Sequence, residues 1–160
     1  MKPAPGLAQQ YRLWLALAFI GLELLAVLAF VWWVMLPMAR RSADDLAGLM
    51  VLSAQTWAEL PPPTRPAFEA ELHERHALQI QSAFEGTGVD EWHPPFYYLL
   101  ESALARRTGH AQHLIRRADA DGQDHYWAWL PAGDGQLAVG VSDARVQTQP
   151  VTALLWSLLL

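Results

Sequence analysis

Apolar residues run almost unbroken from Leu13 to Leu36, and Glu23 is the only ionisable side chain among them. As an α-helix this segment would be about 36 Å long, enough to cross a bilayer hydrocarbon core of about 30 Å. A second apolar run begins at Val151 and continues to Leu160. The pattern predicts one transmembrane helix over residues 13–36 and the truncated start of a second over residues 151–160.

A cleaved signal peptide is the alternative interpretation of the first apolar run. Signal peptides have an apolar region of about 7–15 residues followed by a small-residue cleavage site. The run found here is longer, ends at Leu36-Pro37 and is followed at once by Arg40 and Arg41. These features favour an uncleaved membrane anchor.

Basic residues do not decide the orientation of this anchor, because Lys2 and Arg12 before it balance Arg40 and Arg41 after it. The short leader, residues 1–12, and the return of apolar sequence at residue 151 favour a cytoplasmic N-terminus. We therefore expect residues 37–150 to form a periplasmic domain, anchored in a bacterial inner membrane.

Helical and alternating patterns follow one another through residues 37–150. Apolar spacing predicts a long helix from Pro37 to about Glu59 and a second from about Thr64, separated by three prolines. A third helix should follow Pro94-Pro95 and end at Gly109. Alternation predicts strands over residues 77–84, 113–118, 124–130 and 136–142, with turns at 119–123 and 131–135.

The expected fold class is therefore α+β, a transmembrane helix followed by a domain of three helices and an antiparallel sheet of about four strands. Its core should come from the sheet and the third helix. The side chains expected to be buried there are Leu99, Leu104, Val139 and Val141.

Charge and cysteine content narrow the range of functions. The chain has 16 acidic and 11 basic residues, a net charge of −5, so it has no basic surface of the kind that binds nucleic acid. Cysteine is absent, which excludes disulfides, thiol nucleophiles and cysteine-ligated zinc.

The order of these features resembles that of a known family. Leu36-Pro37 leads from the first span into a long helix, Pro66-Ala67-Phe68 opens a helix that runs into a strand near residue 78, and Gly109 precedes three strands. The chain returns to the membrane at Val151. In these respects it is similar to the input half of EnvZ-like osmosensor histidine kinases.

The resemblance implies a periplasmic domain of the PAS-like kind and a homodimer formed through the first span and the helix after it. Glu23 inside the membrane also favours contact with a partner helix. A transmitter that uses ATP and Mg²⁺ and phosphorylates a response regulator would follow the second span. No residue of this chain corresponds to that transmitter, so we expect no catalysis and no cofactor in the residues present.

Candidate metal ligands are few. His73-Glu74-Arg75-His76 differs from the zinc-protease motif, because its histidines are three residues apart instead of four. Surface histidines on a polar helix face explain it more simply. The weaker alternative is a metal cluster of Glu69, His73 and His76.

Other short patterns have ordinary explanations. Asp119, Asp121 and Asp124 lack the glycine and glutamate positions of an EF-hand and fit a hairpin turn. Gly86-Thr87-Gly88 has no lysine after it and is not a phosphate loop. Six histidines in one domain raise the alternative of acid sensing, although scattered exposed histidines are common.

Signal input is the function that these features favour, with no chemistry performed by residues 1–160. A membrane-tethered binding or scaffold protein is a second possibility, and the input domain of a chemoreceptor or a cyclase is a third. The sequence after Leu160 distinguishes the three. The pattern does not identify the stimulus.

Overall fold

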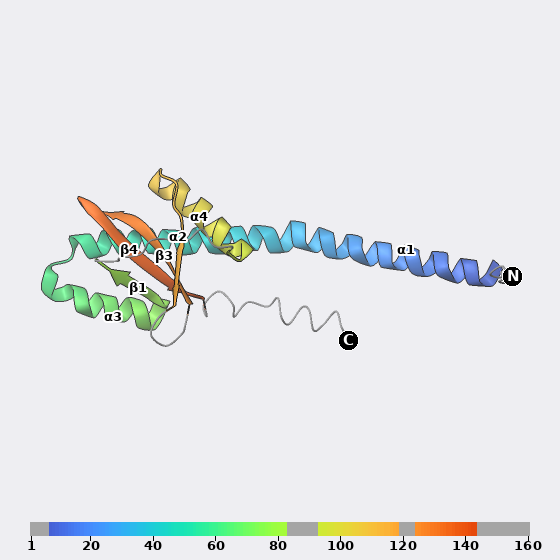
Figure 1. Cartoon of the computed structure of the whole chain (residues 1–160), viewed down its shortest axis with the longest axis horizontal. Helices are drawn as coiled ribbons and strands as arrows, with labels where there is room; N and C mark the ends of the chain where they lie inside the picture. The colour runs from blue at the N-terminus through green and yellow to red at the C-terminus, as the bar shows by residue number, and fades with distance from the viewer. Residues whose placement is uncertain (1–6, 83–92, 119–123, 144–160) are drawn as a thin grey trace. The chain divides into compact units, whose positions relative to one another are not determined.

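The computed structural model describes residues 7–82, 93–118 and 124–143 (Figure 1). The chain forms two compact units, residues 1–41 and residues 42–160. The predicted turn at 119–123 and the predicted second span at 151–160 lie outside the described residues.

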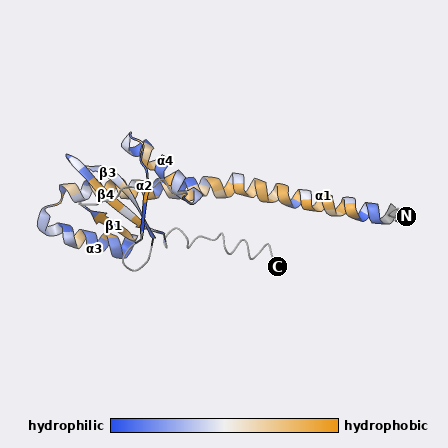
Figure 2. Ribbon diagram, in the orientation of Figure 1, coloured by the Kyte–Doolittle hydropathy of each residue, from blue (hydrophilic) through white to orange (hydrophobic). Residues whose placement is uncertain are grey.

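The first unit is helical. Helix α1 extends over Leu7–Phe30, a π-helical segment η1 follows at Val31–Met35, and helix α2 begins at Leu36. The side chains of residues 9–34 are exposed, although most of them are apolar, and α1 is coloured hydrophobic along most of its length in Figure 2. By length and composition this helix is long and apolar enough to cross a membrane.

The π-helical segment was not expected from the sequence, and Pro37 gives it a physical reason. The backbone N–H of Leu36 bonds to the carbonyl of Val31, five residues back. Pro37 has no N–H to donate to the carbonyl of Trp33, and its ring would crowd that carbonyl in a regular α-helix. A wider turn directly before Pro37 lets the helix continue past it.

The second unit has two layers, as the α+β prediction required. Its four-stranded antiparallel sheet has the order β1-β4-β3-β2. The strands are β1 (Leu78–Gln81), β2 (Ile115–Ala118), β3 (Asp124–Ala132) and β4 (Gly135–Ser142). Helices α2, α3 and α4 contribute to one apolar core with the inner face of this sheet (Figure 1).

Helix α2 (Leu36–Glu59) continues to the residue that the sequence predicted. Its core-facing stripe consists of Ala43, Leu46, Ala47, Met50, Ser53 and Ala54. The spacing of three and four residues places these side chains on one helix face. Leu52, on the opposite side, is 60% exposed.

Trp57 joins the end of α2 to the next helix through side-chain contacts. Pro61 and the 3-10 turn η2 (Pro62–Thr64) end the first helical run, and α3 (Arg65–His76) begins directly after it. The indole Nε1–H of Trp57 donates to Glu69 at 2.7 Å, and the guanidinium of Arg65 lies 4.0 Å from the centroid of the Trp57 ring. Leu72 of α3 is buried.

Helix α4 (Pro95–Thr108) begins after Pro94 and ends at Gly109, as predicted. Gly109 has a φ of 76°, and its N–H bonds to the carbonyl of Ala105, which closes the helix. The expected burial is partly wrong. Leu104 is buried, but Leu99 is only half-buried, because the helix turns Tyr97 fully into the core.

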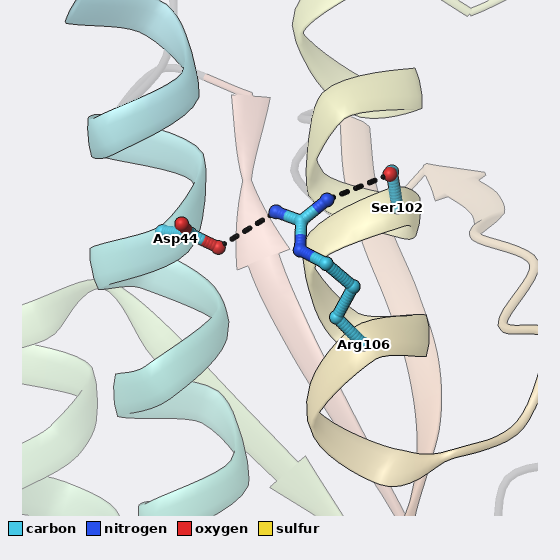
Figure 3. Close-up of polar contacts among 3 residues, drawn as sticks. All are labelled: Asp44, Ser102 and Arg106. Atoms are coloured by element: carbon cyan, nitrogen blue, oxygen red, sulfur yellow. Dashed lines mark hydrogen bonds and ion pairs between the residues drawn. The ribbon is translucent and has the colours of Figure 1, made fainter.

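A surface contact joins α4 to α2. Arg106 donates to Asp44 of α2 at 2.9 Å and to Ser102 one turn back at 3.0 Å (Figure 3). Both charged side chains are substantially exposed, so the pair adds at most about 1 kcal/mol. The helix pair is held mainly by its buried apolar side chains.

The strands differ from the predicted ranges at their ends. Ala77, expected to begin a strand, is instead the left-handed C-cap of α3, with a φ of 49°. Strand β2 begins two residues later than expected. The turn between β3 and β4 is only Gly133-Asp134, because residues 131, 132 and 135 pair within the strands. Gly133 has a φ of 58°, which suits the first central position of a type II′ turn.

Alternation along the strands separates two faces. The inner face carries Val139 and Val141, both fully buried as predicted, with Leu78, Tyr126, Ala128, Leu130 and Leu137. A second, smaller cluster forms on the outer face from Trp127 and Ala138, with Ile115 and Trp129 packed against them. The sheet therefore has an aromatic outer face that the sequence analysis did not anticipate.

Candidate functional site

The outer face of the sheet combines aromatic and hydrogen-bonding side chains. In an antiparallel pair, residues directly opposite each other project from the same side. The register therefore places twelve positions on the outer face: Gln79, Gln81, Ile115, Arg117, His125, Trp127, Trp129, Pro131, Gln136, Ala138, Gly140 and Ser142. None of these twelve is acidic, although the chain as a whole is.

Trp127 is buried on this face by lying over Gly140. The two residues pair across β3 and β4, and a Cβ placed on Gly140 would be only 2.8 Å from atoms of the Trp127 ring. Glycine is therefore required at position 140 for steric reasons. Trp129, two residues further along β3, is half-buried and packs against this cluster.

Beside Trp129 the outer face opens into a cavity of about 510 Å³. Its apolar lining comes from Ala111, Ile115, Trp129 and Pro131. Its polar lining comes from His110, Gln112, His113 and Gln136. Its volume falls in the range of small-molecule sites, and the cavity is wide open to solvent.

The loop that forms one wall of the cavity, residues 109–114, is tied to α4 at both ends. The hydroxyl of Thr108 contacts the carbonyl of Leu104 at 2.9 Å and that of His110 at 3.2 Å. At the other end, the N–H of Leu114 donates to Oε1 of Glu101 at 2.8 Å, and the Leu114 side chain is buried. The cavity wall therefore has a defined backbone conformation.

His110 also has a defined orientation. Its Nδ1 lies 2.9 Å from the backbone carbonyl of Thr108. A carbonyl oxygen only accepts hydrogen bonds, so Nδ1 carries the hydrogen in this contact. The other ring nitrogen, Nε2, then accepts when the imidazole is neutral and donates when it is protonated.

The sequence-derived metal hypothesis gains no support. Glu69, His73 and His76 lie on α3, but no group of three or more acidic or histidine side chains among the described residues is arranged to hold a metal ion. The carboxylate of Glu69 instead accepts the Trp57 indole N–H. Its role in this structure is to join α3 to α2.

The remaining motifs fall partly outside the described residues. Asp119, Asp121 and Gly86-Thr87-Gly88 all lie there. Asp124, which is described, pairs with Arg116 across the β2–β3 ladder. That contact gives Asp124 a structural role in joining two strands.

The six histidines occupy different environments. His73, His110 and His113 are exposed and His76 is half-buried, whereas His93 and His125 are buried. His93 lies edge-on to Tyr126, with ring centroids 5.5 Å apart, and its Nδ1 has no hydrogen-bond partner among the described residues. Only His110 and His113 line the cavity.

The sequence pattern does not predict the cavity residues as a group. Trp127 and Trp129, two residues apart in a strand, were a usable signal, because such a pair must share one face. His110 and His113 gave no comparable signal, because their place beside Trp129 depends on how the loop folds against the sheet.

Comparisons with known proteins add no family assignment. No protein-family model matches the sequence, and no curated protein is significantly similar to it.

Proposed function

We propose that this chain is the signal-sensing input region of a transmembrane two-component sensor histidine kinase. One observation carries the proposal: an apolar helix with exposed side chains is followed, without an intervening loop, by the first core helix of an α+β domain. Such an arrangement suits a domain that detects a stimulus on one side of a membrane and acts on the other.

The proposed topology places residues 1–12 in the cytoplasm and residues 37–150 in the periplasm of a bacterium. The domain, an antiparallel sheet with helices on one face, is compatible with the PAS-like kind that the EnvZ resemblance implies. The cavity beside Trp129 gives it a place to receive a stimulus.

Signalling would occur in a parallel homodimer. The core-facing stripe of α2, which includes Leu46 and Met50, is occupied within one chain. A partner would therefore contact the opposite face, where Leu52 is exposed between Asp45 and Glu59, seven residues before and after it.

Such a dimer would transmit a signal through two packings of similar free energy. A stimulus that favours one packing would shift α2 against its mate. The shift would pass to the transmitter, which would use ATP and Mg²⁺ and phosphorylate a response regulator. The residues described here have no catalytic role in this scheme.

The coding sequence after Leu160 provides the direct test. The proposal requires the rest of a second span, then a dimerisation helix with a phosphoacceptor histidine and an ATP-binding domain. Membranes containing the whole protein should then incorporate phosphate from radiolabelled ATP. A stop codon after Leu160 would instead indicate a tethered binding protein, and a chemoreceptor or cyclase domain would also contradict the kinase proposal.

A further inference from the structure

The cavity on the outer face of the sheet has a lining that selects for a particular ligand chemistry. We propose that it binds a small aromatic carboxylate, with the ring against Trp129 and the carboxylate against His110 and His113. This proposal rests on the proposed function, because it names the class of stimulus for the same domain.

The apolar part of the lining suits a flat ring. Trp129 is half-buried, so part of its indole surface borders the cavity, and Ile115 and Pro131 add apolar surface beside it. Aromatic rings pack favourably on one another in offset or edge-on arrangements. A planar ligand would extend the aromatic cluster that Trp127 and Trp129 already form.

The polar part of the lining suits an anion. Two imidazoles and the amides of Gln112 and Gln136 can all donate hydrogen bonds, and none of the described residues that line the cavity is a carboxylate. Hydrogen bonds from a protonated imidazole to a carboxylate are stronger than neutral ones. A cationic ligand would meet no opposite charge among these described lining residues.

His110 gives the site a group that is oriented in advance. Because its Nδ1–H bonds to the Thr108 carbonyl, the ring is already held when a ligand arrives. Holding a binding group in place lowers the entropy lost on association. The Glu101 contact to the Leu114 N–H holds the far end of the same loop.

Charged groups on the elements around the cavity also act on a bound carboxylate. Among the described residues they are Glu101, Arg106 and Arg107 on α4, Arg116 and Arg117 on β2, Asp124 on β3 and Asp134 in the β3–β4 turn. Arg106 pairs with Asp44, and Arg116 pairs with Asp124.

Three probes that share one ring system test the proposal: 2-naphthoate, 2-naphthamide and 2-naphthylmethylamine. Each is titrated by calorimetry into the full chain in lipid nanodiscs. We expect 2-naphthoate to bind best of the three, about tenfold more tightly than the amine.

Two variants locate the binding. His110→Gln combined with His113→Gln should remove the preference for the anion. Both positions are exposed, and a thermal melt checks that the double variant folds. His73→Gln, an exposed histidine on α3, is the matched control and should leave all three affinities unchanged. Trp129→Leu should weaken all three probes, with a thermal melt confirming that the variant folds.

The proposal is overturned if folded protein binds no 2-naphthoate at millimolar concentration, if the three probes bind equally, or if the double variant binds like the control. None of these results would affect the kinase proposal, which does not depend on this ligand. Conversely, a stop codon after Leu160 would leave the binding result intact.

Discussion

The hydroxyl of Tyr97 donates a 2.8 Å hydrogen bond to Oδ1 of Asp143, and this contact joins the first turn of α4 to the end of β4. Tyr97 is fully buried and stacks on Tyr126, with ring centroids 3.6 Å apart. The bond therefore connects the buried core of the domain to the residue that follows β4.

Replacing Tyr97 by Phe should destabilise the domain. The substitution keeps the ring stack on Tyr126 but removes the hydrogen bond to the carboxylate of Asp143. We expect a loss of about 1–2 kcal/mol in the free energy of unfolding, because hydrogen bonds to charged groups are among the stronger ones. Urea unfolding of the full chain in detergent, followed by near-ultraviolet circular dichroism, measures it.

Tyr98→Phe is the matched control, since Tyr98 is the next residue of α4 and is 49% exposed. Its unfolding free energy should lie within about 0.5 kcal/mol of the native value. Equal effects of the two substitutions would show that the Tyr97 contact with Asp143 adds nothing to stability.

Alkaline pH should also weaken this connection. Burial raises the pKa of Tyr97 above its ordinary value, and the hydrogen bond to Asp143 and the nearby charges raise the pKa further. A group whose pKa is higher in the folded state stabilises that state fully below its unfolded pKa and progressively less above it. Stability should therefore fall as pH rises above about 10.

The Tyr97→Phe variant provides the comparison for this prediction. It lacks the ionisable hydroxyl, so its stability should fall less steeply between about pH 9 and pH 11 than that of the native chain. Parallel urea titrations across this range would reveal the difference. Identical slopes would contradict a buried, protonated Tyr97.

Gly140→Ala tests the packing of the outer face. The added Cβ would be 2.8 Å from the Trp127 ring, so a buried indole would have to move. Overpacking of this kind costs about 1–3 kcal/mol. Gly135→Ala is the control on the same strand, because nothing lies within 4 Å of its Cβ position. If the Gly140→Ala variant were as stable as the control, the Trp127 ring could not lie over Gly140 as described.

Local signals explain which parts of the fold were predictable. Pro61 and Gly109 each end the helix that precedes them, and the alternation at Val139 and Val141 is a property of a single strand, so these elements could be predicted from the sequence. The contact of Tyr97 could not be predicted, because its partner Asp143 lies 46 residues away. A tyrosine that is buried through so distant a contact leaves no periodic signal.

The cavity was unpredictable for the same reason. Its histidines lie on an irregular loop, and their position beside Trp129 depends on contacts from Glu101 and Thr108 of α4. The metal hypothesis was based only on the short spacing between Glu69 and His73 in the sequence. That spacing did not indicate that Glu69 would contact Trp57.

The proposed dimer makes a prediction about positions on α2. The native chain has no cysteine, so single cysteines can be introduced cleanly. Disulfide cross-linking should be strongest at Asp45, Leu52 and Glu59, which are exposed, and weakest at Met50, which is fully buried. Cross-linking that is absent at all four positions in folded, inserted protein would remove the dimer and weaken the kinase proposal with it.

The most direct test of the central claim, a sensor domain held outside the cell membrane by an uncleaved anchor, is the accessibility of single cysteines in intact bacteria. Asp134→Cys lies in the exposed β3–β4 turn, and Lys2→Cys precedes the apolar helix. With a membrane-impermeant maleimide, we predict that Asp134→Cys is labelled in intact cells with permeable outer membranes, and Lys2→Cys only after the inner membrane is disrupted. Labelling of Lys2→Cys in intact cells, with Asp134→Cys protected until disruption, would contradict the account.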